Sequence, residues 1–219
     1  MNTTNAQSDL NKLISESGPR NKKAMLINPP NDSYDIAVEL CQIFKVSMHC
    51  CTNLGDVGVT DFNAVFVGVP ENQSQHPIWV AGHEVWHMLQ HRHLILINEF
   101  ESAEMENILP DAIDQRRFIQ DDGAKNFFDQ RRGIPTNLNP SPDSKIIKEI
   151  FSDVFGNMWC EKEFWHGIRG AHGGIFDDSI DRAIVFLNNH APILYRPWYK
   201  ERHEFIKKLI PLTIKLITP

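Results

Sequence analysis

Apolar residues follow two patterns along this chain. In some segments they form short continuous runs, and in others they recur every three or four positions. The runs are typical of buried strands, and they predict strands at residues 23–28, 46–51 and 62–69. The repeat is typical of helices with one buried side, and it predicts helices at 36–44, 77–91, 144–158, about 178–188 and from about residue 200 onward. The predicted strands therefore all lie before residue 70, and the C-terminal half is expected to be helical.

The remaining segments are less regular. Residues 1–22 are polar, and we expect a flexible N-terminal arm there, with at most a short helical turn. Residues 23–219 are long and apolar enough for one substantial core, so a single domain is expected. Residues 94–97 are either a short strand or more helix, and the acidic run at 99–106 is expected to be solvated. Residues 107–145 are expected to form a long excursion and not a second domain.

Composition narrows the classes of function. A net charge of −6 and a pI near 5.9 argue against a nucleic-acid-binding surface. No apolar run approaches the length of a membrane span, and residues 1–9 contain no apolar signal core. The four cysteines, of which Cys50 and Cys51 are adjacent, are expected to be reduced thiols. We therefore expect a cytoplasmic protein without a membrane or nucleic-acid partner, and export without a cleaved signal stays open.

The candidate chemistry lies in the predicted helix 77–91, which contains the pattern His-Glu-x-x-His. His83 and His87 are one helical turn apart, so they project from the same face and can bind one zinc ion, Zn2+. Glu84 lies beside them and is placed to take a proton from water without itself being a ligand. The alternative is that His83 and His87 are hydrogen-bonded core histidines around a buried Glu84, which is costly without a cation.

A catalytic zinc needs three protein ligands and one open position, so a third ligand is required. His91 lies about 12 Å along the helix axis from His83 and is too distant to share the metal. The better candidate is Glu149 in the helix 144–158, with Asp153 one turn later as hydrogen-bond acceptor for a ligand histidine. The alternative is a helix whose carboxylates are simply solvated.

Together, His83-Glu84-x-x-His87 and Glu149-x-x-Ser152-Asp153-x-Phe155-Gly156 resemble the gluzincin class of zinc metallopeptidases, with a thermolysin-like glutamate helix. The resemblance implies an α+β, zincin-like fold: a small mixed β-sheet, an active-site helix with both histidines, and a second helix with the glutamate. In that class the sheet's edge strand precedes the active-site helix and pairs with extended substrate, and residues 62–69 fit that place. His87 and Glu149 are 62 positions apart, more than in thermolysin-like enzymes, which leaves Glu101 as the alternative third ligand.

The activity implied by the resemblance is hydrolysis of a peptide bond in a peptide or protein substrate. Glu84 would be the general base and would return the proton to the leaving amine. A further group usually stabilises the oxyanion, and His172, in a glycine-rich loop, is our assignment. The other candidates for that role are His190, Tyr195 and Arg202.

Two other classes of function remain open. One is a zinc hydrolase that acts on something other than a peptide. The other is a binding or regulatory protein, such as a toxin- or effector-like one, in which the zinc site is structural or degenerate. Zinc content and the presence of an open coordination position distinguish these classes.

Overall fold

The computed structural model describes residues 3–56, 58–61, 64–69, 77–104, 148, 151–152, 155–156, 159 and 203–218. The chain divides into two compact units. Unit 1 consists of Met1–His93 and Ser152–Ser179, and unit 2 consists of Leu94–Phe151 and Ile180–Pro219. The expected single domain at 23–219 stays a prediction. Within the described ranges, no helix combines the length and the apolar character that a membrane crossing needs.

Unit 1 contains a four-stranded mixed sheet, so the predicted α+β class with a small mixed sheet is confirmed. Its strands are β1 (Met25–Ile27), β2 (Ser47–Thr52), β3 (Gly58–Thr60) and β4 (Ala64–Gly68), in the spatial order β1-β2-β4-β3. β2 and β4 are parallel, whereas β1 and β3 run antiparallel to their neighbours. Three strands match the predicted ones, and β3 was not predicted.

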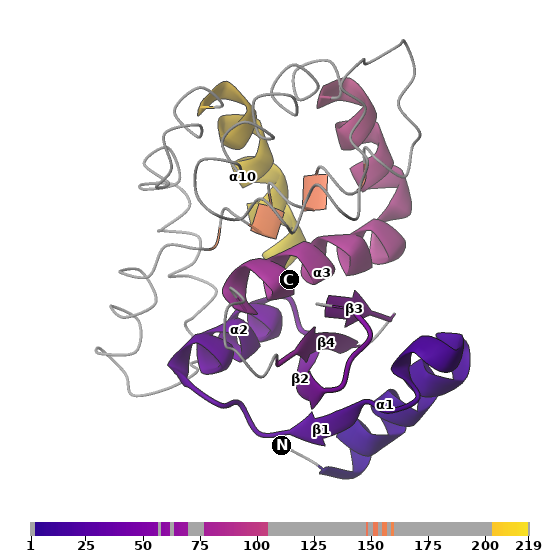
Figure 1. The fold of residues 1–219 in the computed structure, drawn as a ribbon. Coiled ribbons are helices and arrows are strands. Elements are labelled where there is room, and N and C mark those ends of the chain that lie inside the picture. Colours follow the sequence, from indigo (N-terminus) through magenta and orange to yellow (C-terminus); the bar gives the residue numbers. More distant parts are fainter. Residues whose placement is uncertain are drawn as a thin grey trace, which may run out of the picture. The chain divides into compact units, whose positions relative to one another are not determined.

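The prediction that residues 62–69 form an edge strand is wrong about the position of this strand in the sheet. β4, which falls within residues 62–69, lies inside the sheet between β2 and β3. Its five residues are all buried, as expected for an internal strand. The edge on that side is β3, which joins β4 in an antiparallel pair (Figure 1). A strand of three residues that begins with glycine gives almost no apolar signal, which is why the sequence did not reveal it.

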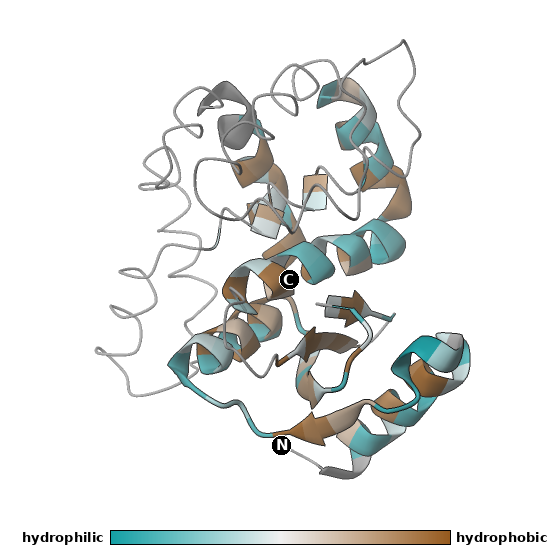
Figure 2. Ribbon diagram, in the orientation of Figure 1, coloured by the Kyte–Doolittle hydropathy of each residue, from teal (hydrophilic) through white to brown (hydrophobic). Residues whose placement is uncertain are grey.

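Both faces of the sheet are covered. His49 and Cys51 of β2 point to the face that carries helix α1 (Thr3–Glu16), where Cys51 shares a buried cluster with Leu10 and Leu13. Met48 and Cys50 point to the opposite face, which carries helices α2 (Asp32–Ile43) and α3 (Pro77–Arg92). Figure 2 shows that the strands are mostly apolar, whereas α1 is mostly hydrophilic.

The expectation of a flexible arm at residues 1–22 is corrected by α1 and by the short 3-10 helix that follows it, Gly18–Asn21. Leu10 and Leu13 are only 2% and 4% exposed, because residues three apart share one side of a helix. Asp9 adds a 3.0 Å contact to His49 Nε2 on β2. The segment is polar in composition, and its narrow apolar stripe accounts for the wrong prediction.

Helix α2 begins at Asp32, one turn earlier than its apolar repeat indicated. Its cap is Asn31, whose side-chain oxygen accepts a hydrogen bond from the Ser33 backbone N–H at 3.0 Å. Ser33 and Asp35, which also have side chains that can cap a helix, lie in its first turn. Asparagine is among the strongest capping residues, so the observed start has a clear local cause.

Three cysteines fall in the described part of the chain, Cys41, Cys50 and Cys51, and none forms a disulfide. Burial raises the pKa of the Cys50 and Cys51 thiols to about 12. Burial raises the pKa of Cys41 as well, helped by the neighbouring Cys50 and Glu84. These thiols are therefore unreactive core residues at neutral pH.

Unit 2 is helical where it is described. Residues 94–104 are helical, so the strand alternative for 94–97 is wrong. The expectation of a solvated acidic run holds for Glu99, which is exposed, and is wrong for Glu101 and Glu104, which are only 4% and 7% exposed. Both share one side of the helix with the fully buried Ile97. Glu104 forms a 2.9 Å ion pair with Lys208 of helix α10 (His203–Ile217).

Helix α1 provides a direct test of the fold. Leu13→Ala should lower the free energy of unfolding by about 2–5 kcal/mol, because it leaves a cavity between α1 and the sheet. Urea unfolding followed by circular dichroism measures this change. Asn11→Ala on the exposed side of α1 is the control, and it should stay within about 0.5 kcal/mol of wild type. A flexible arm would give equally small effects for both variants.

Candidate functional site

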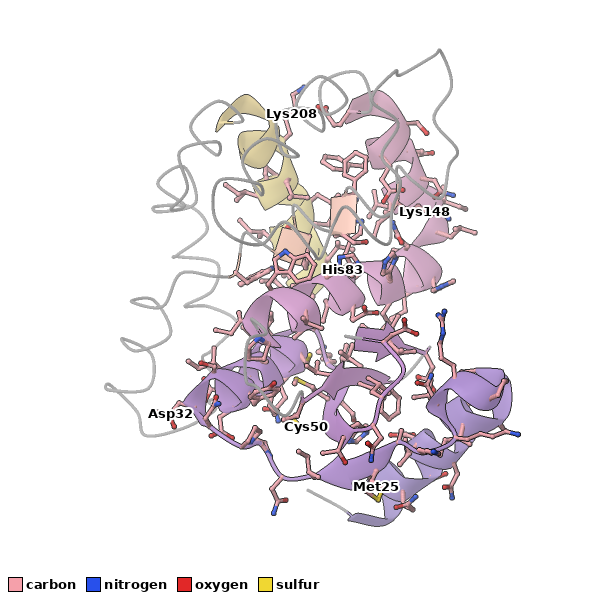
Figure 3. The ribbon with its side chains drawn as sticks, viewed as in Figure 1. Met25, Asp32, Cys50, His83, Lys148 and Lys208 are labelled. Atoms are coloured by element: carbon pink, nitrogen blue, oxygen red, sulfur yellow. The ribbon has the colours of Figure 1, made fainter. Side chains whose placement is uncertain are left out.

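Helix α3 carries the three predicted residues of the motif. Its first residue is Pro77, which suits a first turn because a missing N–H costs nothing there. His83 and Glu84 are 4% and 8% exposed, and His87 is partly buried. Figure 3 shows His83 on this helix among the surrounding side chains. The motif is thus held on a helix whose other side chains fix its position by packing.

The two histidines meet through their outer ring nitrogens. His83 Nε2 and His87 Nε2 are 3.0 Å apart, and the ring centroids are 4.7 Å apart at 74°. Two zinc–nitrogen bonds of about 2.0–2.1 Å at a tetrahedral angle place the nitrogens about 3.3–3.4 Å apart. The observed pair is a few tenths of an ångström closer, as an N–H···N hydrogen bond would hold it. If the two Nε2 atoms moved apart by a few tenths of an ångström, their spacing would match that of two zinc ligands. Imidazole nitrogen is also a donor that zinc prefers.

The inner ring nitrogen of His87 also has partners. Gln90 Oε1 lies 2.9 Å from His87 Nδ1, and Ser152 Oγ lies 3.3 Å from the same atom. Gln90 is 3% exposed and Ser152 is fully buried. Sequence reasoning missed both roles. Gln90 was detectable as a polar residue one turn after His87 on a largely apolar helix, and Ser152 was used only as part of the resemblance.

The segment with Ser152 crosses α3 at backbone contact. A Cβ added to Gly156 would lie 2.5 Å from the Trp79 carbonyl oxygen and 3.0 Å from the His83 backbone nitrogen. A Cβ added to Gly82 would lie 2.8 Å from Gly156 Cα. Residues 151–152 and 155–156 are helical, in agreement with the predicted helix 144–158. Only glycine at these two positions lets the backbones come this close.

Aromatic side chains pack beside this crossing. The Phe155 ring lies 4.8 Å from the Trp86 ring and 5.6 Å from the Phe44 ring, measured between centroids. Trp159, one turn later, is 5.7 Å from Phe44. Phe155 and Trp159 are fully buried, so they bind the segment to α2 and α3 within unit 1. This packing places Ser152 next to His87.

Glu84 lies against the edge strand. A Cβ added to Gly58 of β3 would lie 2.8 Å from Glu84 Cγ and 2.9 Å from Glu84 Oε1. The strand therefore passes close to the Glu84 side chain at Gly58, where a larger residue would displace Val80 or Glu84. Gly58, after Gln90 and Ser152, is a third site residue that the sequence did not reveal.

The other predicted site residues are only partly placed. Glu149, Asp153 and His172 lie outside the described residues. The same is true of the other candidates for oxyanion stabilisation, which are His190, Tyr195 and Arg202. Glu101 is described in unit 2 as a buried side chain. Among the described residues, no three His, Cys, Asp or Glu side chains are grouped to hold a metal ion. The third ligand is thus still a prediction.

Comparison with known proteins gives no match: no family model, no curated protein and no solved structure is significantly similar to this chain. The assignment of the site consequently rests on its own residues and their geometry.

The helix crossing can be tested by the sign of a stability change. Gly156→Ala should lower the free energy of unfolding by about 1–3 kcal/mol, because the new methyl group meets the backbone of α3. An alanine at an unobstructed helical position would instead stabilise the protein by about 1 kcal/mol. Urea unfolding measures the difference. A stabilised Gly156→Ala variant would contradict the crossing.

Proposed function

We propose that this chain is a zinc-dependent metallopeptidase in which His83, His87 and Glu149 hold the metal and Glu84 is the general base. The observation that carries the proposal is the 3.0 Å approach of His83 Nε2 to His87 Nε2 on a buried helix, with Glu84 beside them. A carboxylate and two imidazoles are costly to bury together without a cation. A metal site explains why this helix contains all three.

Each residue has a separate task in this proposal. The two histidines and Glu149 would hold zinc, which when bound polarises a carbonyl group and acidifies water. Glu84 would accept a proton from the attacking water and then donate it to the leaving amine. The closeness of its side chain to Gly58 supports this role, because it places the carboxylate beside the strand along which a peptide could bind. Asp153 as partner of a ligand histidine and His172 as oxyanion stabiliser complete the proposal.

Strand β3 favours a peptide over other hydrolysable substrates. In the described part of the chain no strand pairs with its outer side. Such an edge offers backbone N–H and C=O groups with which an extended peptide can pair. A peptide bound there would lie along the strand that contacts Glu84. The edge strand thus supplies a means of presenting a peptide bond to the proposed base.

The metal itself is the first test. Elemental analysis of the purified chain should find about one zinc per molecule. His83→Ala and His87→Ala should each remove most of it and lower the melting temperature, because metal binding is linked to folding. Full zinc occupancy in the double variant would refute the ligand pair.

The third ligand is tested in the same assay. Glu149→Gln should lose most of the zinc affinity, since an anionic ligand becomes a neutral amide. Asp153→Asn should weaken zinc binding only about 10–100-fold. Glu101→Gln serves as the matched carboxylate change and should retain zinc. The opposite result, with Glu101 required and Glu149 dispensable, would identify Glu101 as the ligand.

The role of Glu84 is tested separately. Glu84→Gln should keep the zinc and the fold while lowering peptide turnover by at least ~10², because an amide cannot accept the proton. Zinc content, circular dichroism and cleavage of a peptide library are measured on the same sample. Loss of zinc in this variant would show that Glu84 is a ligand instead. Retained zinc without peptide cleavage in the wild type would favour a hydrolase of another substrate or a structural site.

A further inference from the structure

Gln90 has a specific relation to the proposed ligand His87. Its side chain is 3% exposed, and its Oε1 atom lies 2.9 Å from His87 Nδ1. In the amide orientation of this structure Gln90 Oε1 accepts the hydrogen bond, so His87 Nδ1 carries the proton of this contact. Ser152 Oγ, at 3.3 Å from the same nitrogen, is a longer second contact that a hydroxyl can adapt to. The neutral His87 ring is thereby held in its Nδ1–H tautomer.

This tautomer determines what the other nitrogen can do. With the proton on Nδ1, His87 Nε2 has a lone pair, which points at His83 Nε2 across 3.0 Å. Two lone pairs at this distance repel each other unless a proton or a cation lies between them. Without metal, His83 must therefore donate its Nε2–H to His87. With metal, both Nε2 atoms must present lone pairs, and the His83 proton must move to Nδ1.

We infer that Gln90 is a positioning residue that prepares His87 for the metal, and that His83 is the histidine whose tautomer changes when the metal binds. The statement that the His83 tautomer changes when the metal binds rests on the proposed function. The statement that Gln90 sets the His87 tautomer concerns the metal-free protein and follows from the contact between Gln90 and His87. The two proposed ligands thus have different tautomers before the metal binds, although both are histidines of the same motif.

Gln90 can keep the His87 ring oriented in the metal-free protein. It orients the imidazole as a carboxylate would, but it adds no second negative charge to a helix that already buries Glu84. Because Gln90 follows His87 by one turn on α3, the same rigid element carries both the ligand and its partner. The site therefore needs no other segment of the chain to set the His87 tautomer.

The test measures tautomers by nitrogen-15 NMR on the full-length, metal-free chain at pH 8, with His83→Asn and His87→Asn variants to assign the signals. In the wild type, His87 should be the Nδ1–H tautomer and His83 the Nε2–H tautomer. Adding Zn2+ should convert His83 to Nδ1–H and leave the His87 tautomer unchanged. An Nε2–H tautomer for metal-free His87 would overturn the inference, whether or not zinc binds.

Variants at position 90 provide the second readout, zinc affinity measured by chelator competition. Gln90→Met removes the acceptor at similar volume, so it should weaken zinc binding about 10–100-fold and mix the His87 tautomers. Gln90→Glu restores an acceptor of equal reach and should return the Nδ1–H tautomer. Met88→Leu, a volume-conserving change at a fully buried position of the same helix, is the control and should change neither.

The two proposals fail in different ways. The predicted tautomers without zinc binding would refute the metallopeptidase and retain the role of Gln90 for His87. Zinc binding with unchanged affinity and unchanged tautomers in Gln90→Met would retain the metal site and refute the role of Gln90.

Discussion

The close approach of two backbones at Gly82 and Gly156 is the constraint on which the site depends. A methyl group at either position would meet backbone atoms of the facing segment at 2.5–2.8 Å. Because of this approach, Ser152 comes within 3.3 Å of His87 Nδ1, although the two residues are 65 positions apart in the chain. Phe155 and Trp159 then bury their rings against α2 and α3, which stabilises the crossing. A site assembled in this way depends on packing and not on flexible loops.

The polar groups of α3 are unusual for a helix buried on nearly all sides. Burying an imidazole or carboxylate without partners costs several kcal/mol, on the order of the stability of many domains. For the histidines the helix offsets this cost with partners at close range: His83 with His87, and His87 with Gln90. A core that needed only apolar packing would not retain such a row. Hydrogen-bonded core histidines would make the same contacts, so the zinc content of the chain is what distinguishes a metal site from that alternative.

The sequence predicted the elements with strong apolar periodicity and missed those held by tertiary contacts. Helix α3 was expected at 77–91 and is observed at Pro77–Arg92, because its proline start and apolar repeat are local signals. Strand β3 escaped detection because Gly58 is there for its approach to Glu84 and not for strand propensity. Helix α1 escaped because two leucines in a polar segment gain their importance only against the sheet. The contact of Gln90 with His87 was likewise invisible to a pattern that ends at the second histidine.

These missed elements are connected in the structure, and the connection leads to the site. Lys12 of α1 lies 3.5 Å from Asp61 Oδ2, and Asp61 Oδ1 accepts the Ala64 backbone N–H at 2.8 Å. Asp61 thus ties α1 to the turn between β3 and β4. The antiparallel pair of β3 and β4 carries Gly58, which lies close to the side chain of the proposed general base Glu84. A polar N-terminal helix on one face of the sheet therefore helps to place the edge strand beside the carboxylate on α3.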